Sequence, residues 1–178
     1  QEVSRARRAH LRGSHIALCD LDGAKLARVT RLAERINATT DANFKITGTT
    51  DYRDALAGAE FVVTSVELDR LARWKLDWEI PRKYGIRHVL GENGGPGALT
   101  HSRRVIDLVL GIAREVEVRA PNAYLLNYSN PMSRVMLAIT RYTRLRAVGL
   151  CHQGIAGYFS AAYVLGMSTY FNPHQHPA

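Results

Sequence analysis

Cys151 and His152 are adjacent, and both are residue types that can bind a transition metal or move a proton. A cysteine at this place can also be a buried structural thiol, and the histidine a structural, hydrogen-bonded one. The chain has only one other cysteine, Cys19, and no CxxC spacing, so the sequence does not indicate a disulfide framework. Any role of the Cys151 thiol therefore does not depend on pairing with a second cysteine. If the role is chemical, the Cys151-His152 pair predicts either a metal ligand or a reactive thiolate.

The segment Asn127-Tyr128-Ser129-Asn130-Pro131 places two amide side chains directly after an apolar run. An asparagine amide both donates and accepts hydrogen bonds, which suits the hydroxyl groups of a polyol. The alternative is a turn with an asparagine cap before a helix that begins near Pro131. Spacing alone leaves both interpretations open.

Asp20 follows the apolar run from His15 to Cys19, and Asp22 stands two residues later. In a dinucleotide-binding fold, a carboxylate at the end of a strand accepts hydrogen bonds from the adenosine ribose, which favours NAD over NADP. A helix cap is the other interpretation, and Asp22 competes with Asp20 for either role. No G-x-G-x-x-G fingerprint precedes the run. Because Gln1 to Arg12 resembles the helix that follows this fingerprint, either the first strand and phosphate loop are missing or the domain binds no dinucleotide.

These residues need a framework, and short apolar runs that alternate with amphipathic stretches predict an α/β protein with a parallel sheet. The predicted strands are His15–Cys19, 44–47, 60–66 (buried on both faces), 123–127 and 147–150. The predicted helices are 24–37, 52–57, an excursion within 68–88, 98–119, one after Pro131 and one near 155–165. Four glycines and a proline between Gly91 and Gly97 predict an irregular loop that brings backbone close to a ligand.

The carboxyl ends of parallel strands meet at one edge of a sheet, where ligands of open α/β sheets bind. The unusual polar residues of this sequence follow the predicted strands: Asp20, 47–51, Asn127, Asn130, Cys151 and His152. We therefore predict a Rossmann-like, doubly wound parallel sheet whose first strand and glycine phosphate loop are missing. Residues 1–152 are the expected cofactor-binding domain, and 153–178 the start of a second α/β domain.

The composition narrows the class of protein further. The 178 residues are 46% hydrophobic, and no stretch approaches the roughly 18 consecutive apolar residues of a membrane span. A net charge of +8 is spread along the chain without a nucleic-acid-binding motif, so we expect neither a membrane nor a nucleic acid as partner. The cysteine content favours the cytoplasm.

The order and spacing of several stretches resemble glycoside hydrolase family 4, whose members are NAD- and manganese-dependent glycosidases. The resemblance covers about 16–166, and its matching stretches are Thr49-Thr50-Asp51, 55–59, 79–85, 91–97, 127–131 and 149–152. It implies hydrolysis of an O-glycosidic bond by C3 oxidation with NAD, C2 deprotonation and elimination, with help from a divalent cation. The implied substrate is a small carbohydrate, and the implied assembly a homo-dimer or homo-tetramer.

The resemblance also implies roles for particular residues. Cys151 matches the metal ligand, His152 the proton donor of some members, and Glu92 an acidic residue that polarises the catalytic base. Asn130 matches the substrate-binding asparagine. Asn127 lies where it can serve the nicotinamide end of the cofactor or the sugar. Thr50 and Asp20 complete the predicted cofactor contacts.

The chain departs from the family near its end, where the family has a second, histidine metal ligand and further on a tyrosine base. His174 and His176 do not match the expected context of that ligand. Two other functions stay open: an NAD-dependent dehydrogenase of the lactate or malate type, and a non-catalytic nucleotide- or sugar-binding module. The dehydrogenase would need a substrate-binding arginine and a catalytic histidine, for which Arg73 and His88 or His101 are loose candidates.

Overall fold

The computed structural model describes residues 11–40, 42–88 and 94–167. Its backbone contacts divide the chain into two compact units. The first consists of residues 1–55 and 154–178, and the second of residues 56–153. We describe each unit by itself.

The first unit is a βαβ arrangement. Strand β1 (His15–Cys19) leads through helix α2 (Gly23–Thr40) to strand β2 (Lys45–Thr49), and the strands pair in parallel from His15–Lys45 to Cys19–Thr49. Helix α3 (Tyr52–Leu56) begins here, and helix α7 (Gln153–Val164) lies almost wholly in this unit. Leu26 is the buried residue of α2.

The second unit contains a parallel sheet in the order β3-β4-β5. Its strands are β3 (Phe61–Thr64), β4 (Tyr124–Asn127) and β5 (Arg146–Gly149), and its helices are α4 (Arg70–Lys83), α5 (Gly95–Arg119) and α6 (Met132–Tyr142). Every strand pair of the two described sheets is parallel, which confirms the predicted α/β class with a parallel, Rossmann-like framework.

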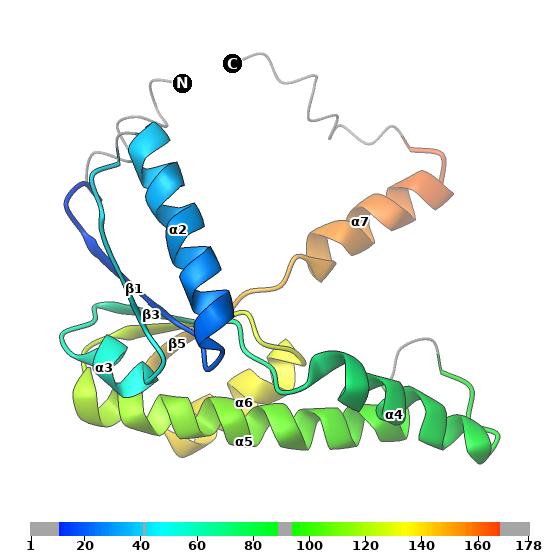
Figure 1. Cartoon of the computed structure of the whole chain (residues 1–178). Helices are drawn as coiled ribbons and strands as arrows, with labels where there is room; N and C mark the ends of the chain where they lie inside the picture. Colours follow the sequence, from blue (N-terminus) through cyan, green and yellow to red (C-terminus); the bar gives the residue numbers. More distant parts are fainter. Residues whose placement is uncertain (1–10, 41, 89–93, 168–178) are drawn as a thin grey trace. The chain divides into compact units, whose positions relative to one another are not determined.

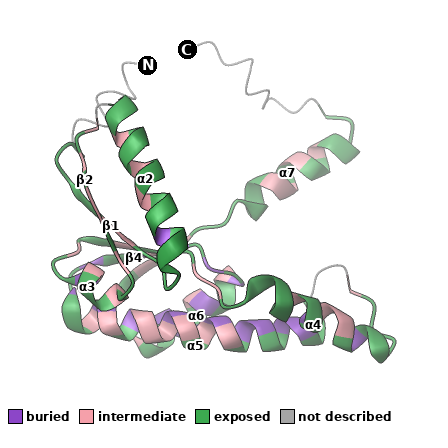
Figure 2. Ribbon diagram, viewed as in Figure 1, coloured by how far each residue is buried: buried purple, intermediate pink, exposed green. Residues whose placement is uncertain are grey.

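The core of the second unit lies along one stripe of α5 (Figure 2). This stripe repeats every three or four residues, which is the spacing of one helix face. Its fully buried apolar members are Ala98, Val105, Val109, Ala113 and Val116, and they share the core with Leu125, Val135 and Ile139.

Strand β3 is covered on one face, contrary to the prediction that both its faces are buried. Phe61 and Val63 are 61% and 60% exposed, whereas Thr64 is 2% exposed. Successive side chains of a strand point to opposite faces of the sheet, so an unbroken apolar run does not distinguish one covered face from two.

Helix α5 begins inside the segment predicted to be an irregular loop. Gly95, Pro96 and Gly97 form its first turn, with Gly94 as the extended N-terminal cap. The prediction was wrong for these three residues because the first N–H groups of a helix have no partner within the helix, so proline is tolerated there. Residues 89–93 lie outside the described part of the chain.

Helix α4 carries both tryptophans of the sequence. The guanidinium carbon of Arg82 lies 4.1 Å from the centre of the Trp78 ring, and the Trp78 carbonyl oxygen lies 3.1 Å from His88 Nε2. The Trp74 Nε1 is buried and finds no hydrogen-bond partner in the part of the chain that the structure describes. Of the helices described, none is both long and apolar enough to cross a membrane.

Helix α6 packs closely against the end of β5. A Cβ atom placed on Gly149 would lie 2.5 Å from Met132 Sδ and 2.5 Å from Met136 Cγ. Only a residue without a side chain permits this approach.

Candidate functional site

The carboxyl edge of the second sheet brings together the predicted residues that follow β4 and β5. In the register of these adjacent strands Asn127 pairs with Gly149, two residues before Cys151. The Leu150 N–H donates to the Asn127 carbonyl oxygen at 2.9 Å, so the strands remain joined beyond the ladder. The two asparagines and the Cys151-His152 pair therefore share one edge, as predicted.

Asn127 is completely buried, and its amide is engaged within the protein. Its Oδ1 accepts hydrogen bonds from the Thr64 hydroxyl (3.0 Å) and the Ser129 N–H (3.2 Å), while its Nδ2 donates to the Ser129 carbonyl (3.0 Å). These bonds connect the end of β3 to the turn after β4. The geometry makes Asn127 a support for that turn, and its contact with a cofactor stays a prediction.

Asn130 is exposed at the end of the same turn, and a cis peptide bond joins it to Pro131. The turn is held by the Ser129 hydroxyl, which accepts a hydrogen bond from the Val66 N–H at 2.9 Å. The Asn130 side chain is thus presented to solvent from a fixed backbone, which is the arrangement that a substrate-binding amide requires.

Cys151 and His152 are both exposed. The Cys151 Sγ accepts a hydrogen bond from the Gln153 N–H at 3.4 Å, where α7 begins. Within residues 11–40, 42–88 and 94–167, no group of three or more histidine, cysteine or acidic side chains is arranged to hold a metal ion. Cys151 is available as one ligand, and the described residues do not supply a complete set.

The predicted cofactor residues Asp20 and Thr50 lie in the first unit, after β1 and β2, and both are exposed. Asp22 is the helix cap: its Oδ1 accepts the N–H groups of Ala24 (2.9 Å) and Lys25 (3.0 Å). The N–H of Lys25, above all, lowers the pKa of Asp22. Asp22 fills the capping role, and Asp20, whose Oδ1 accepts the Asp22 N–H at 2.8 Å, stays the predicted residue for a ribose contact.

Cys19 ends β1 among carboxylates. Burial raises the pKa of its thiol, and the negative charges of Asp20, Asp51 and Asp54 raise it further. A raised pKa keeps the thiol protonated, and a protonated thiol is a poor metal ligand. The remaining predicted residues, Glu92, His174 and His176, lie outside the described residues.

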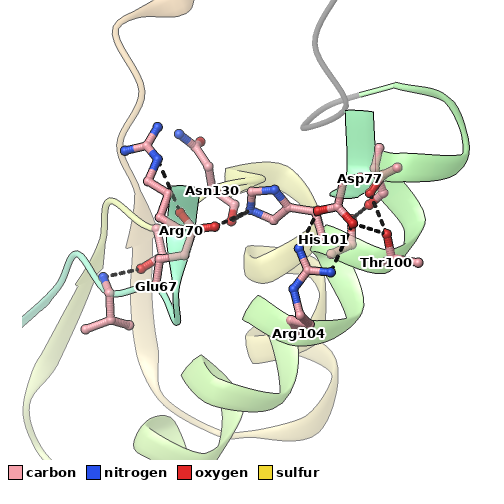
Figure 3. A network of polar contacts seen from close by, with 12 residues as sticks. Glu67, Arg70, Asp77, Thr100, His101, Arg104 and Asn130 are labelled. Carbon is pink, nitrogen blue, oxygen red and sulfur yellow. Dashed lines mark hydrogen bonds and ion pairs between the residues drawn. The ribbon is translucent and has the colours of Figure 1, made fainter. Parts of the chain in front are cut away.

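Close to the turn lies a polar network that the sequence did not predict (Figure 3). Asp77 is 6% exposed and pairs with both terminal nitrogens of Arg104, and its Oδ1 also accepts the Thr100 hydroxyl at 2.6 Å. Burial alone would raise the pKa of Asp77, but the hydrogen bonds from Arg104 and Thr100 and the charge of Arg104 lower it overall.

Next to this network, His101 contacts the turn. Its Nε2 lies 3.1 Å from the Asn130 carbonyl oxygen and 3.4 Å from Glu67 Oε1. One sequence signal could have found it: His101 stands on the buried stripe of α5, one helical turn before Val105. Because a buried histidine needs hydrogen-bond partners, its place on an apolar stripe indicates a polar contact inside the protein.

Two shallow surface hollows of the second unit lie at the opposite edge of the sheet. One is lined by the first residues of β3 and β4, Phe61 and Tyr124, and the other by residues just before β5, Thr143 and Arg144. Neither hollow contains a predicted site residue, so neither is a candidate for the chemistry at the carboxyl edge.

Known proteins resemble this chain along most of its length. A model described as family 4 glycosyl hydrolase matches residues 3–165. An alpha-glucosidase of Erwinia rhapontici is 48% identical over 145 residues, which are 80% of this chain and 32% of that protein. An alpha-galactosidase of Rhizobium meliloti is 34% identical over 157 residues, 88% of this chain and 32% of that protein. The chain thus spans about a third of the length of these relatives.

Among solved structures, a 6-phospho-alpha-glucosidase from gut microorganisms, in complex with NAD and Mn²⁺, superposes with a TM-score of 0.74. The superposition covers 87% of this chain and 35% of the other, at 22% sequence identity. At this identity the likeness shows a shared fold.

Proposed function

Because the chain belongs to the family 4 glycosyl hydrolases, we propose that this protein hydrolyses O-glycosidic bonds of a small carbohydrate with NAD and a divalent cation such as Mn²⁺. One observation carries the proposal: Asn130, Cys151 and His152 follow neighbouring parallel strands and are all exposed at the carboxyl edge of one sheet. The relatives named glucosidase and galactosidase support the reaction class, and the complex of the solved glucosidase supports the cofactors. Membership of this family argues against the dehydrogenase and the binding module.

Cys151 fits the role of a metal ligand because its thiol is exposed and accepts a single backbone N–H. Asp20 fits a ribose contact because Asp22 already caps α2, and Thr50 is exposed at the end of the neighbouring strand. When bound, NAD would supply reversible oxidation at sugar C3, and the cation would stabilise the negative charge that develops after C2 deprotonation.

The residues of the chain supply position and proton transfer in this proposal. The Asn130 amide binds a hydroxyl group of the sugar, and the His152 imidazole donates a proton to the departing oxygen. Glu92 polarises the catalytic base. Asn127 supports the turn that carries Asn130, and its predicted contact with the nicotinamide end of NAD or with the sugar is part of the proposal.

The reaction is tested with the full-length protein on nitrophenyl glycosides, with and without NAD⁺, Mn²⁺ and a reductant. We expect hydrolysis that requires the dinucleotide and the cation and is lost when the cation is removed by a chelator. Hydrolysis that persists without both would exclude this mechanism.

The metal ligand is tested by Cys151→Ser, with Cys19→Ser as the matched control. Both thiols are exposed, but only Cys151 follows β5 at the proposed site. We expect Cys151→Ser to bind Mn²⁺ at least ten-fold more weakly, as measured by calorimetry, while Cys19→Ser binds it normally. Equal affinities in the two variants would reject the assignment.

We also propose that residues 1–152 form the cofactor-binding domain and that a second domain begins at 153, where α7 starts. The start of a helix directly after the Cys151-His152 pair supports this boundary. Cytoplasmic location and assembly as a homo-dimer or homo-tetramer complete the proposal, and light scattering of the purified protein tests the assembly.

A further inference from the structure

His101 is the most deeply buried titratable side chain near the site. It lies on α5 and is 1% exposed, and Figure 3 shows its ring between the Asn130 backbone and the side of the network formed by Asp77 and Arg104. The two oxygen atoms near its Nε2 are the Asn130 carbonyl oxygen, at 3.1 Å, and Glu67 Oε1, at 3.4 Å. Its Nδ1 is buried and has no hydrogen-bond partner among the described residues.

This geometry determines where the ring carries its proton. Both oxygens near Nε2 accept hydrogen bonds. If Nε2 carried no proton, its lone pair would face the lone pairs of these two oxygens. A proton on Nδ1 alone would also bury a donor without a partner, which costs about 1–3 kcal/mol. The Nε2–H form avoids both costs and donates to the Asn130 carbonyl oxygen.

Glu67 supports this arrangement from the end of β3. Its Oε1 faces His101, while its Oε2 lies 3.6 Å from Arg70 Nε. The segment after β3 contacts the turn after β4 directly, through the bond from the Val66 N–H to the Ser129 hydroxyl, and indirectly, through the contact of Glu67 with His101. The Asn130 carbonyl is fixed by His101, and the preceding residue is fixed by Val66 and Asn127.

We propose that His101 is a positioning residue, whose Nε2–H holds the Asn130 backbone so that the exposed Asn130 amide meets the sugar in one orientation. The proposal deepens the proposed function and rests on it, since it takes Asn130 as the substrate-binding amide. A histidine that only fills the core also needs a hydrogen-bond partner, so the bond from Nε2 does not by itself distinguish the two roles. A positioning role and a core-filling role predict different substitutions of His101 that preserve substrate binding.

The test compares His101→Gln with His101→Phe in the full-length enzyme. The glutamine amide nitrogen can reach the place of Nε2 and donate, whereas phenylalanine keeps the ring volume and loses the donor. With a nitrophenyl alpha-glucoside as substrate, we expect His101→Phe to raise KM about ten-fold with a smaller change in kcat, and His101→Gln to recover most of the loss. The Kd of NAD⁺ should stay within two-fold in both variants.

A double-mutant cycle with Asn130→Ala separates positioning from general packing. If His101 acts through the Asn130 amide, His101→Phe should change KM by less than two-fold once that amide is absent. The same ten-fold increase in both backgrounds would overturn the proposal, and so would an unchanged KM in a folded His101→Phe variant.

Hydrogen exchange gives a measure that does not depend on activity. Backbone amides of residues 128–134 should exchange faster in His101→Phe than in His101→Gln, and equal rates would overturn the proposal. Wild-type protein that hydrolyses no glycoside under any cofactor condition would instead reject the proposed function, whatever the exchange rates are.

Discussion

The buried carboxylate of Asp77 makes the free energy of unfolding depend on pH. Its pKa is lowered because the hydrogen bonds and the charge of Arg104 outweigh the effect of burial. A carboxyl group with a lower pKa in the folded state stabilises the fold above its unfolded pKa of about 3.9. This stabilisation is lost as the pH falls below that value and through the folded pKa.

We therefore predict that Asp77→Asn lowers the free energy of unfolding at pH 7 by about 2–4 kcal/mol, because Arg104 loses its buried partner. Urea denaturation between pH 2 and pH 7 checks this, and the difference from wild type should shrink below pH 4. Asp107→Asn is the matched control: Asp107 pairs with Arg103 on the same helix, but both side chains are more than half exposed. It should change the free energy by less than about 0.5 kcal/mol.

At the same scale, the sequence predicted some site residues and not others for a physical reason. Asn130 and Cys151 follow apolar runs, and the parallel arrangement of the strands brings the ends of such runs to one edge. The contacts from Asp77 to Arg104 and from His101 to Asn130 join residues 27 and 29 positions apart on different elements. Such pairs depend on how helices pack, which local patterns do not encode.

Among the elements, the contact between α6 and β5 depends on one glycine. Gly149→Ala would force the new Cβ against Met132 and Met136, so we expect it to lower the free energy of unfolding by about 1–3 kcal/mol. Gly111→Ala is the control, because nothing lies within 4 Å of a Cβ at that position in the middle of α5. It should raise stability by about 0.4–1 kcal/mol, as thermal melts can measure.

Element order and type could be predicted because hydrophobic periodicity is a local property. The predicted strand His15–Cys19 coincides with β1, and the predicted helix 98–119 ends where α5 ends. Its start was missed because Gly95 and Pro96 act as helix-starting residues only when the following turn forms. The exposure of Phe61 and Val63 was missed because it depends on which elements cover the sheet.

For the whole molecule, the distribution of buried residues predicts two levels of stability. The most deeply buried side chains described, among them Leu125, Ile139 and His101, all lie in the second unit. Local unfolding is easiest where few side chains are buried. We therefore predict that the amides of β4 exchange at least ten-fold more slowly than those of β1.

Native-state hydrogen exchange read by mass spectrometry measures this difference, with peptides that cover 15–19 and 124–127. Binding of NAD⁺ should slow exchange in the first peptide if Asp20 and Thr50 contact the cofactor. Identical protection of the two strands in the free protein would contradict the assignment of two units with unequal cores.

The two tryptophans on α4 make the surroundings of that helix accessible to fluorescence measurements. In a polypeptide of these 178 residues, tryptophan fluorescence comes from Trp74 and Trp78, which stand on either side of Asp77 in the sequence of α4. A change in emission on adding a sugar or a cation would therefore report on the environment of one helix, without any label. Titrations of this polypeptide follow the surroundings of Asp77 while the active-site variants are compared.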